Sequence, residues 1–305
     1  MLLDREAITA RFQTLLAGAF DYEAALKHHK ITEDDIDNLR ELCKSSDQIP
    51  KSLPDQFFLI VLASYMKNFD KSVNAIHNYS KLIHDTPQWF HKRDLMSNAV
   101  QLAFDHQYFF NLPPIPDKNY NVVYHALSSY EPRHYVFDEA EQAFMMTIEA
   151  CIYDNGPRDG LVFLFDMKGT KISHVFQPSL RSLRQLMRFV EDGCPFKIRA
   201  IHVLNTVPFL DLILAILKPM IRTDLMKKVF FHSTNMDYEK FYEEWIPKSC
   251  LPSNYGGDLG TVDEIHNKQR KSILKLRDYF LLEEKVFNFE LEDFDFSYHG
   301  TDTRL

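Results

Sequence analysis

Apolar runs of strand length alternate with segments of helical period through the middle of the chain. Residues 161–165 form a continuous apolar run, which is typical of a strand covered on both faces. The further segments with the length and composition of strands are residues 122–127, 197–204 and 229–231. Helical period falls on residues 137–153, 178–192 and 209–217. This order predicts an α/β fold with a largely parallel sheet, flanked by helices and joined by right-handed crossovers.

The region before this sheet reads as helices, from residue 1 to about residue 110. Pro113, Pro114 and Pro116 then break the helical pattern and mark the expected boundary. We therefore predict three parts: a helical subdomain over 1–112, a sheet domain over 113–262, and a C-terminal helix with an acidic-aromatic tail over 263–305. In that tail, acids alternate with aromatic and aliphatic residues, including Phe287, Phe294 and Phe296. The pattern fits either a strap along the domain or a disordered peptide.

The most apolar segment of the chain is the 15-residue run over 207–221, which also contains Asp211 and Lys218. A membrane span needs roughly 20 apolar residues, so this run predicts a buried or interfacial helix. Its apolar side chains cover more of the helix than one buried face requires. Such a helix can close a pocket and later meet lipid. The cations in or just after it, which are typical of a membrane-interface segment, are Lys218, Arg222, Lys227 and Lys228.

Charge is unevenly distributed along the chain, whose net charge is −8. This balance argues against general nucleic-acid binding, whereas the basic stretch over 178–228 suits an anionic membrane surface. A solvated helix face of mixed charge explains the same pattern equally well. The polar start at Asp4, Arg5 and Glu6 does not resemble a signal peptide. With four widely spaced cysteines, we expect reduced thiols and a cytoplasmic protein that contacts membranes transiently.

Sequence motifs for catalysis or metal binding are missing. The chain has nine glycines and contains no GxGxxG, GxxxxGK[ST], GxSxG or HExxH segment. His28 and His29 are adjacent, but no carboxylate lies at ligand spacing on the same element. His202 and Asp166 read more simply as a core histidine and a turn residue. We therefore expect no enzyme activity, no cofactor and no metal site.

A pocket for a hydrophobic ligand needs a floor, walls and a movable cover. Apolar residues at suitable periods come from the strands, the helices between them and the segment over 209–217. The candidate lining residues are Phe144, Ile148, Leu161, Phe163, Phe165, Ile172, Leu186, Phe189, Val190, Ile198, Ile201, Phe209, Ile213 and Leu217. Periodicity alone fits equally well a solid core in which these residues pack against one another.

Several short motifs resemble the CRAL-TRIO family of lipid-binding proteins. They include Phe58-Leu59 and Lys67-Asn68-Phe69-Asp70 in the helical region. In the sheet region they are Phe165-Asp166 with Gly169, Ile201-His202 with Asn205, Lys218-Pro219, and Leu251-Pro252 with Tyr255-Gly256-Gly257. The order and spacing resemble the tocopherol- and retinal-binding branch, especially its insect-type members. The resemblance implies that the sheet forms a pocket floor and that the helix near residues 207–220 acts as a mobile lid.

The resemblance also bears on phosphoinositides, which some family members bind in a basic recess beside the lid. Lys197 and Lys228 match such basic positions. The arginines that usually follow the Phe-Leu pair are absent, and Ile60 and Val61 stand in that stretch. Phosphoinositide binding is therefore left open by the sequence.

Taken with the resemblance, these patterns predict a monomeric carrier that holds a small hydrophobic ligand and releases it at membranes. Two alternatives remain: a lipid sensor or adaptor of the same fold, and an enzyme acting on a lipid. A carrier moves ligand between vesicles, a sensor does not, and an enzyme alters the ligand chemically.

Overall fold

A computed structural model describes residues 5–46 and 48–291 of the 305-residue chain. Its centre is a five-stranded sheet whose strands lie in sequence order. The strands are β1 (Gln107–Ile115), β2 (Tyr120–Leu127), β3 (Gly160–Asp166), β4 (Ile198–Leu204) and β5 (Val229–Phe231). β1 pairs with β2 antiparallel, and every later pairing is parallel. The predicted α/β fold is confirmed.

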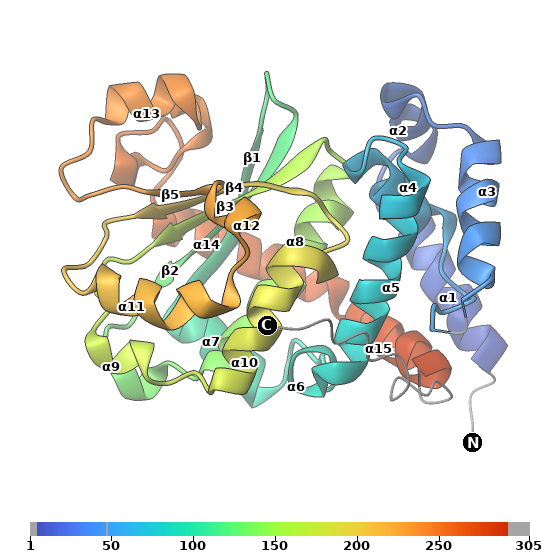
Figure 1. Cartoon of the computed structure of the whole chain (residues 1–305), viewed down its shortest axis with the longest axis horizontal. Helices are drawn as coiled ribbons and strands as arrows, with labels where there is room; N and C mark the ends of the chain where they lie inside the picture. Colours follow the sequence, from blue (N-terminus) through green and yellow to red (C-terminus); the bar gives the residue numbers. More distant parts are fainter. Residues whose placement is uncertain (1–4, 47, 292–305) are drawn as a thin grey trace.

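Helices cover both faces of this sheet (Figure 1). One face carries α8 (Phe137–Asn155) and α10 (Leu180–Arg188), and the short helix α9 (Ile172–Val175), α11 (Leu210–Leu217) and α12 (Thr223–Met226) lie toward the same side. The other face carries α13 (Tyr238–Glu244) and α14 (Val262–Ile273). Side chains alternate between the two faces along β3, and both faces are apolar. Leu161 and Phe163 belong to the core on the α8 side, and Val162 and Leu164 belong to the core on the α14 side. A strand buried on both faces was predicted here.

The N-terminal region is helical up to His106 and packs beside the sheet domain (Figure 1). Its helices are α1 (Arg5–Ala17), α2 (Tyr22–His29), α3 (Glu33–Lys44), α4 (Asp55–Ser64), α5 (Phe69–Asp85), α6 (Pro87–Phe90) and α7 (Asn98–His106). The C-terminal helix α15 (Arg277–Leu291) returns to pack against α1 and α5. Phe287 is buried there, with its ring centroid 6.1 Å from that of Tyr79. Phe294 and Phe296 lie outside the described residues.

The predicted elements agree with the structure except at two places. The helix expected over 178–192 becomes α10 and then widens into a π-helical turn, Phe189–Gly193. The second difference is β1, which the sequence did not predict, and the expected boundary at 112/113 falls inside it. Pro113 and Pro114 look like a linker, but β1 is the edge strand of the sheet, where a residue without an amide donor is tolerated. The division into domains itself stays a prediction.

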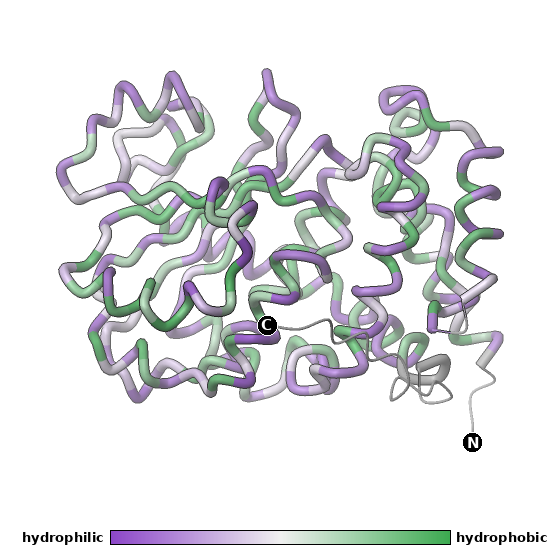
Figure 2. Tube along the Cα trace, viewed as in Figure 1, coloured by the Kyte–Doolittle hydropathy of each residue, from purple (hydrophilic) through white to green (hydrophobic). Residues whose placement is uncertain are grey.

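Figure 2 shows hydrophobic colour along the strands and along α11. Among residues 5–46 and 48–291, no helix has both the length and the apolar composition of a membrane span. None of the α11 side chains is fully buried, and they range from half-buried to exposed.

Candidate functional site

A cavity of about 210 Å³ lies between α11, α9 and the carboxyl ends of β2 and β3. Its walls are mainly apolar. The lining residues are His125, Leu127, Tyr135, Phe165, Asp166, Met167, Thr170, His174, Val175, Pro178, Leu183, Ile213, Ile216 and Leu217. For scale, a dry apolar cavity of about 150 Å³ can hold benzene. The space beneath α11 is therefore large enough for part of an organic molecule, and a longer ligand requires α11 to move.

Three of the residues predicted to line a pocket do line this cavity: Phe165, Ile213 and Leu217. Other predicted residues form the solid core beside it. Phe144 packs between the rings of Phe163 and Phe165, with centroid distances of 5.2 and 5.5 Å. The remaining core residues are Ile148, Leu161, Phe189, Ile198 and Ile201.

The last four predicted residues lie at the margins. Leu186 and Val190 are half-buried against the same core. Phe209 is half-buried at the N-terminal cap of α11. Ile172 is 48% exposed, on the outer side of the turn that carries α9. The cavity is therefore smaller than the predicted pocket and lies closer to the carboxyl ends of the strands.

Two histidines of the cavity wall had no distinguishing signal in the sequence. The His125 ring stacks on Phe109 at a centroid distance of 4.8 Å, and its Nε2 contacts Gln107 Oε1 at 2.9 Å. Burial lowers the pKa of His125 to about 4, so its ring is neutral. The His174 ring accepts a hydrogen bond at Nδ1 from the Lys171 amide at 2.8 Å.

The other ring nitrogen of His174 is buried and has no hydrogen-bond partner among the residues that the structure describes. Burial lowers the pKa of His174, which favours the neutral ring. Because Nδ1 accepts a hydrogen bond, the single proton of this neutral ring is on Nε2. The cavity is thus lined by one residue that has an unused hydrogen-bond donor.

Asp166 stands at the carboxyl end of β3 and joins four segments of the chain. Its Oδ1 accepts hydrogen bonds from the Lys168 amide at 2.7 Å and from Asn205 Nδ2 at 2.8 Å. Its Oδ2 accepts one from the Tyr255 hydroxyl, which also contacts the hydroxyl of Tyr124. Asp166 is a buried structural residue and holds the loop ends next to the cavity in place.

The loop that carries Tyr255 depends on its glycines. Gly256 has a φ of 70°, which is a backbone conformation that glycine adopts without strain. A side-chain carbon on Gly257 would lie 2.0 Å from the Leu251 carbonyl oxygen. The Leu-Pro and Tyr-Gly-Gly motif therefore encodes a tight turn that presents Tyr255 to Asp166.

The cations predicted to meet a membrane fall into separate groups. Arg222 forms a bidentate pair with Asp192 at 2.6 and 2.7 Å, and Lys227 pairs with Asp224 at 3.1 Å. Lys218 is exposed beside α11.

The remaining two cations, Lys197 and Lys228, belong to a basic cluster that also contains Arg199 and Lys71. Partial burial lowers the pKa of Lys197, and the charges of these neighbours lower it further. Lys228 donates to the carbonyl oxygen of Ile198 at 3.0 Å. This cluster lies at the amino ends of β4 and β5, whereas the cavity lies at the carboxyl ends of the strands. Because β4 has seven residues, about 20 Å of strand separates the two.

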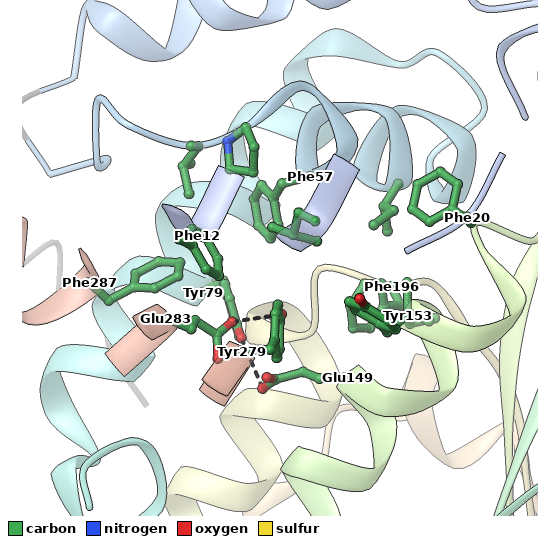
Figure 3. Close-up of a pocket in the computed structure, with 15 residues that line it drawn as sticks. Phe12, Phe20, Phe57, Tyr79, Glu149, Tyr153, Phe196, Tyr279, Glu283 and Phe287 are labelled. Atoms are coloured by element: carbon green, nitrogen blue, oxygen red, sulfur yellow. Dashed lines mark hydrogen bonds between the residues drawn. The ribbon is translucent and has the colours of Figure 1, made fainter. Parts of the chain in front are cut away.

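A second, smaller cavity of about 40 Å³ lies between α1, α4, α5, α8 and α15 (Figure 3). Most of its walls are aromatic or aliphatic, and two carboxylates, Glu149 and Glu283, lie at one side. The buried Arg93 guanidinium pairs with both of them, and the Tyr279 hydroxyl donates to Glu283 at 3.1 Å. This space is sufficient for a few water molecules. The residues around this cavity pack the C-terminal helix against the N-terminal helices.

Two residues of types that often act in catalysis, His202 and Cys194, are buried in the core. His202 is buried beside Trp245, and its Nδ1 lies 3.0 Å from His232 Nε2. Burial raises the pKa of the Cys194 thiol to about 12, so it is protonated and unreactive. All four cysteines are buried and free, as the sequence predicted.

The sequence of the sheet domain matches a known protein family. The CRAL/TRIO domain matches residues 106–257, which includes all five strands, α11 and the Tyr255 loop. The chain belongs to the CRAL/TRIO family. The CRAL/TRIO match begins at the residue before β1, so it includes this edge strand in full. Proteins of this family commonly bind small lipophilic ligands.

Individual relatives are distant. Alpha-tocopherol transfer protein-like from Homo sapiens is 26% identical over 231 residues, or 75% of this chain. The protein of the same name from Mus musculus is 24% identical over the same share of this chain. These matches span 66% of each relative's own length. Clavesin-1 from Xenopus laevis is 23% identical over 42% of this chain and 38% of its own length. A crystal structure of Sfh5 aligns over 87% of this chain and 93% of that chain, with a TM-score of 0.46 and 11% identity.

Proposed function

We propose that this CRAL/TRIO protein binds one small hydrophobic molecule in the cavity beneath α11 and transfers it between membranes. The observation that carries the proposal is the cavity itself, with Phe165, Ile213 and Leu217 in its wall. Burying about 400 Å² of ligand hydrocarbon contributes on the order of 10 kcal/mol at ~25 cal/mol per Å². The costs of association and ordering reduce this gain but leave enough for stable carriage.

We further propose that the ligand has one polar group that pairs with His174. Within residues 5–46 and 48–291, the buried Nε2 donor of His174 lacks a partner. A hydroxyl or carbonyl oxygen on the ligand would supply one. A neutral hydrogen bond of this kind contributes about 0.5–1.5 kcal/mol. Largely apolar molecules with one hydroxyl or carbonyl group at one end, such as tocopherols, retinol and retinal, meet this requirement, whereas a pure hydrocarbon does not.

The test compares retinol with a retinoid hydrocarbon of the same length in a fluorescence titration. Wild-type protein should bind the alcohol about 2–10-fold more tightly, and His174→Phe should remove that preference while still binding the hydrocarbon. Binding of neither compound would contradict the pocket. An unchanged preference in His174→Phe would contradict the polar anchor alone.

Release is proposed to occur where apolar side chains are exposed next to the cavity. Ile172, Phe176 and Leu180 are 48%, 65% and 58% exposed, and they alternate with the cavity residues His174, Val175 and Pro178. A contiguous patch of exposed apolar side chains can mark an interaction surface, and these three lie within nine residues of one another in the sequence. Insertion of these side chains into a leaflet would bring the opening between α9 and α11 to the membrane.

The basic cluster supports a preference for anionic membranes and, as a finer proposal, for phosphoinositides. Near an anionic leaflet each cation is worth ~1 kcal/mol, or about fivefold in binding. Lys197→Glu and Lys228→Glu should each weaken binding to acidic vesicles by at least that factor. Lys227→Glu is the matched control and should have a smaller effect, because Lys227 is already paired with Asp224.

Vesicles of equal charge separate the two versions of this proposal. If vesicles with phosphatidylinositol bisphosphate bind no better than vesicles with phosphatidylserine, the cluster recognises charge alone. If Lys197→Glu and Lys228→Glu bind acidic vesicles like wild type, the basic cluster plays no part at the membrane.

A further inference from the structure

Two histidines and an aspartate meet where the helical region touches the sheet domain. His28 and His29 are the last residues of α2, and Asp159 is in the turn between α8 and β3. One potential ligand atom from each of the three lies within 4.8 Å of the others. Asp159 follows His29 by 130 positions in the sequence, which is why no spacing motif indicates the three residues together.

His29 is oriented as a metal ligand. Its side chain is 6% exposed, and its Nε2 lies 3.1 Å from the Pro157 carbonyl oxygen. A carbonyl oxygen can only accept, so Nε2 carries the proton. In the neutral imidazole, Nδ1 then has a free lone pair. Histidines that bind metals usually donate their other ring nitrogen to a carbonyl or carboxylate in this way.

The lone pair of His29 faces a second acceptor. His29 Nδ1 is 3.5 Å from Asp159 Oδ1, and neither atom brings a proton to this contact when the ring is neutral. The Asp159 backbone is held on both sides: its amide donates to the Asn119 carbonyl at 3.0 Å, and its carbonyl accepts from Arg199 at 2.8 Å. A cation between the two acceptors would turn their repulsion into attraction.

His28 supplies a third lone pair. Arg158 donates to Asn119 Oδ1 at 2.8 Å, which fixes the orientation of the Asn119 amide. Asn119 Nδ2 is therefore a donor, and His28 Nε2 accepts its hydrogen bond at 3.1 Å. The His28 ring is exposed, so it can exchange this hydrogen bond for a metal with little rearrangement.

We propose that His28, His29 and Asp159 bind a divalent transition-metal ion, with Zn²⁺, Ni²⁺ and Cu²⁺ as the suitable class. Two imidazoles and one carboxylate suit these ions, whereas Ca²⁺ and Mg²⁺ prefer a shell of oxygen atoms. Three protein ligands leave a coordination position for water. The ion would tie the end of α2 to the turn that leads into β3, and so fasten the helical region to the sheet domain.

The proposal is tested with the full chain, free of any histidine tag and stripped with EDTA before the chelator is removed. Calorimetric titration with Zn²⁺ should give one ion per chain, and Mg²⁺ at the same concentration should give no binding. Asp159→Asn and His28→Asn are suitable variants because both side chains are substantially exposed, so the fold tolerates them. Each should weaken Zn²⁺ binding by at least about tenfold.

His84→Asn is the matched control, because His84 lies 3.2 Å from Asp85 and offers one imidazole and one carboxylate. It should leave Zn²⁺ binding unchanged. Zn²⁺ should also slow hydrogen exchange in residues 22–30 and 154–160 together. Absence of Zn²⁺ binding, or binding that Asp159→Asn and His28→Asn leave unaltered, would overturn the site. Binding lost in His106→Asn would assign the ion to the stacked His106 and His134 rings instead.

Discussion

The Tyr255 hydroxyl donates a hydrogen bond to Asp166 Oδ2 at 2.5 Å, although the two residues are 89 positions apart. Burial, together with the nearby Tyr124 and Asp166, raises the pKa of Tyr255 far above its usual value, so Tyr255 remains a donor. The contact connects the end of β3 with the turn at Gly256 and Gly257. Two segments that are 89 positions apart thus meet in one hydrogen bond, whose role is to hold the fold together.

Tyr255→Phe should destabilise the protein by about 1–3 kcal/mol. The change removes the donor from a buried carboxylate while it keeps the ring. Urea unfolding measures the loss, and the exposed Tyr130→Phe is the control, with an expected change within about 0.5 kcal/mol. Equal stabilities for wild type and Tyr255→Phe would show that the bond contributes nothing net.

Ile213→Trp should abolish ligand loading and leave the free energy of unfolding nearly unchanged. Ile213 faces the cavity, so a larger side chain fills empty space. Ile201→Trp is the comparison variant. Ile201 is in the solid core, so this change should lower the free energy of unfolding by ~1–3 kcal/mol through overpacking. Retinol fluorescence and urea unfolding report the two effects. The cavity assignment is wrong if Ile213→Trp is the destabilised variant and still takes up retinol.

Phe176→Ser combined with Leu180→Ser should slow transfer of a fluorescent retinoid between vesicles without weakening its binding in solution. These two side chains are the most exposed apolar groups beside the cavity, and serine removes their gain on entering the leaflet. Leu102→Ser is the control, because Leu102 is also exposed (39%) but lies on α7. Equal transfer rates for the double variant and Leu102→Ser would eliminate this surface as the membrane contact.

His202 should make the protein less stable as the pH falls. Burial, reinforced by the neighbouring His232, lowers its pKa to about 3 from an unfolded value near 6.5. Because the folded pKa is depressed, the stability linked to the neutral ring is complete above pH 6.5 and is lost as the pH falls toward 3. His125, with a pKa of about 4, acts in the same direction.

The free energy of unfolding should therefore decline between pH 6.5 and about 4, by up to ~1.4 kcal/mol per pH unit for each such group. In His202→Asn this slope should be smaller than in wild type. An NMR titration in which His202 protonates near pH 6.5 would contradict the account. Both wild type and His202→Asn should bind ligand at pH 7, since His202 is outside the cavity wall.

The sheet and its helices could be predicted because apolar runs and helical periods are local signals. β1 escaped prediction for an equally local reason, since Pro113 and Pro114 indicate a break wherever they occur. Only the assembled sheet places these prolines on an edge, where their missing amides cost little.

The cavity could be predicted only in part. Phe163 and Phe165 point to the same face of β3, yet Phe163 is covered by Phe144, and Phe165 reaches the space beneath α11. Periodicity assigns both to one face and cannot tell a packed residue from a lining one. His174 and the Asp166 network depend on contacts between distant segments, and they carry no periodic signal.

The central claim, that a hydrophobic molecule occupies the cavity, is tested most directly by native mass spectrometry of the protein purified from its natural source. Wild type should retain one small molecule per chain, recovered in unaltered form by organic extraction. Ile213→Trp, expressed in the same source, should appear at its bare mass. A bare mass for wild type in every preparation, together with no uptake of retinol or tocopherol from vesicles, would contradict the account.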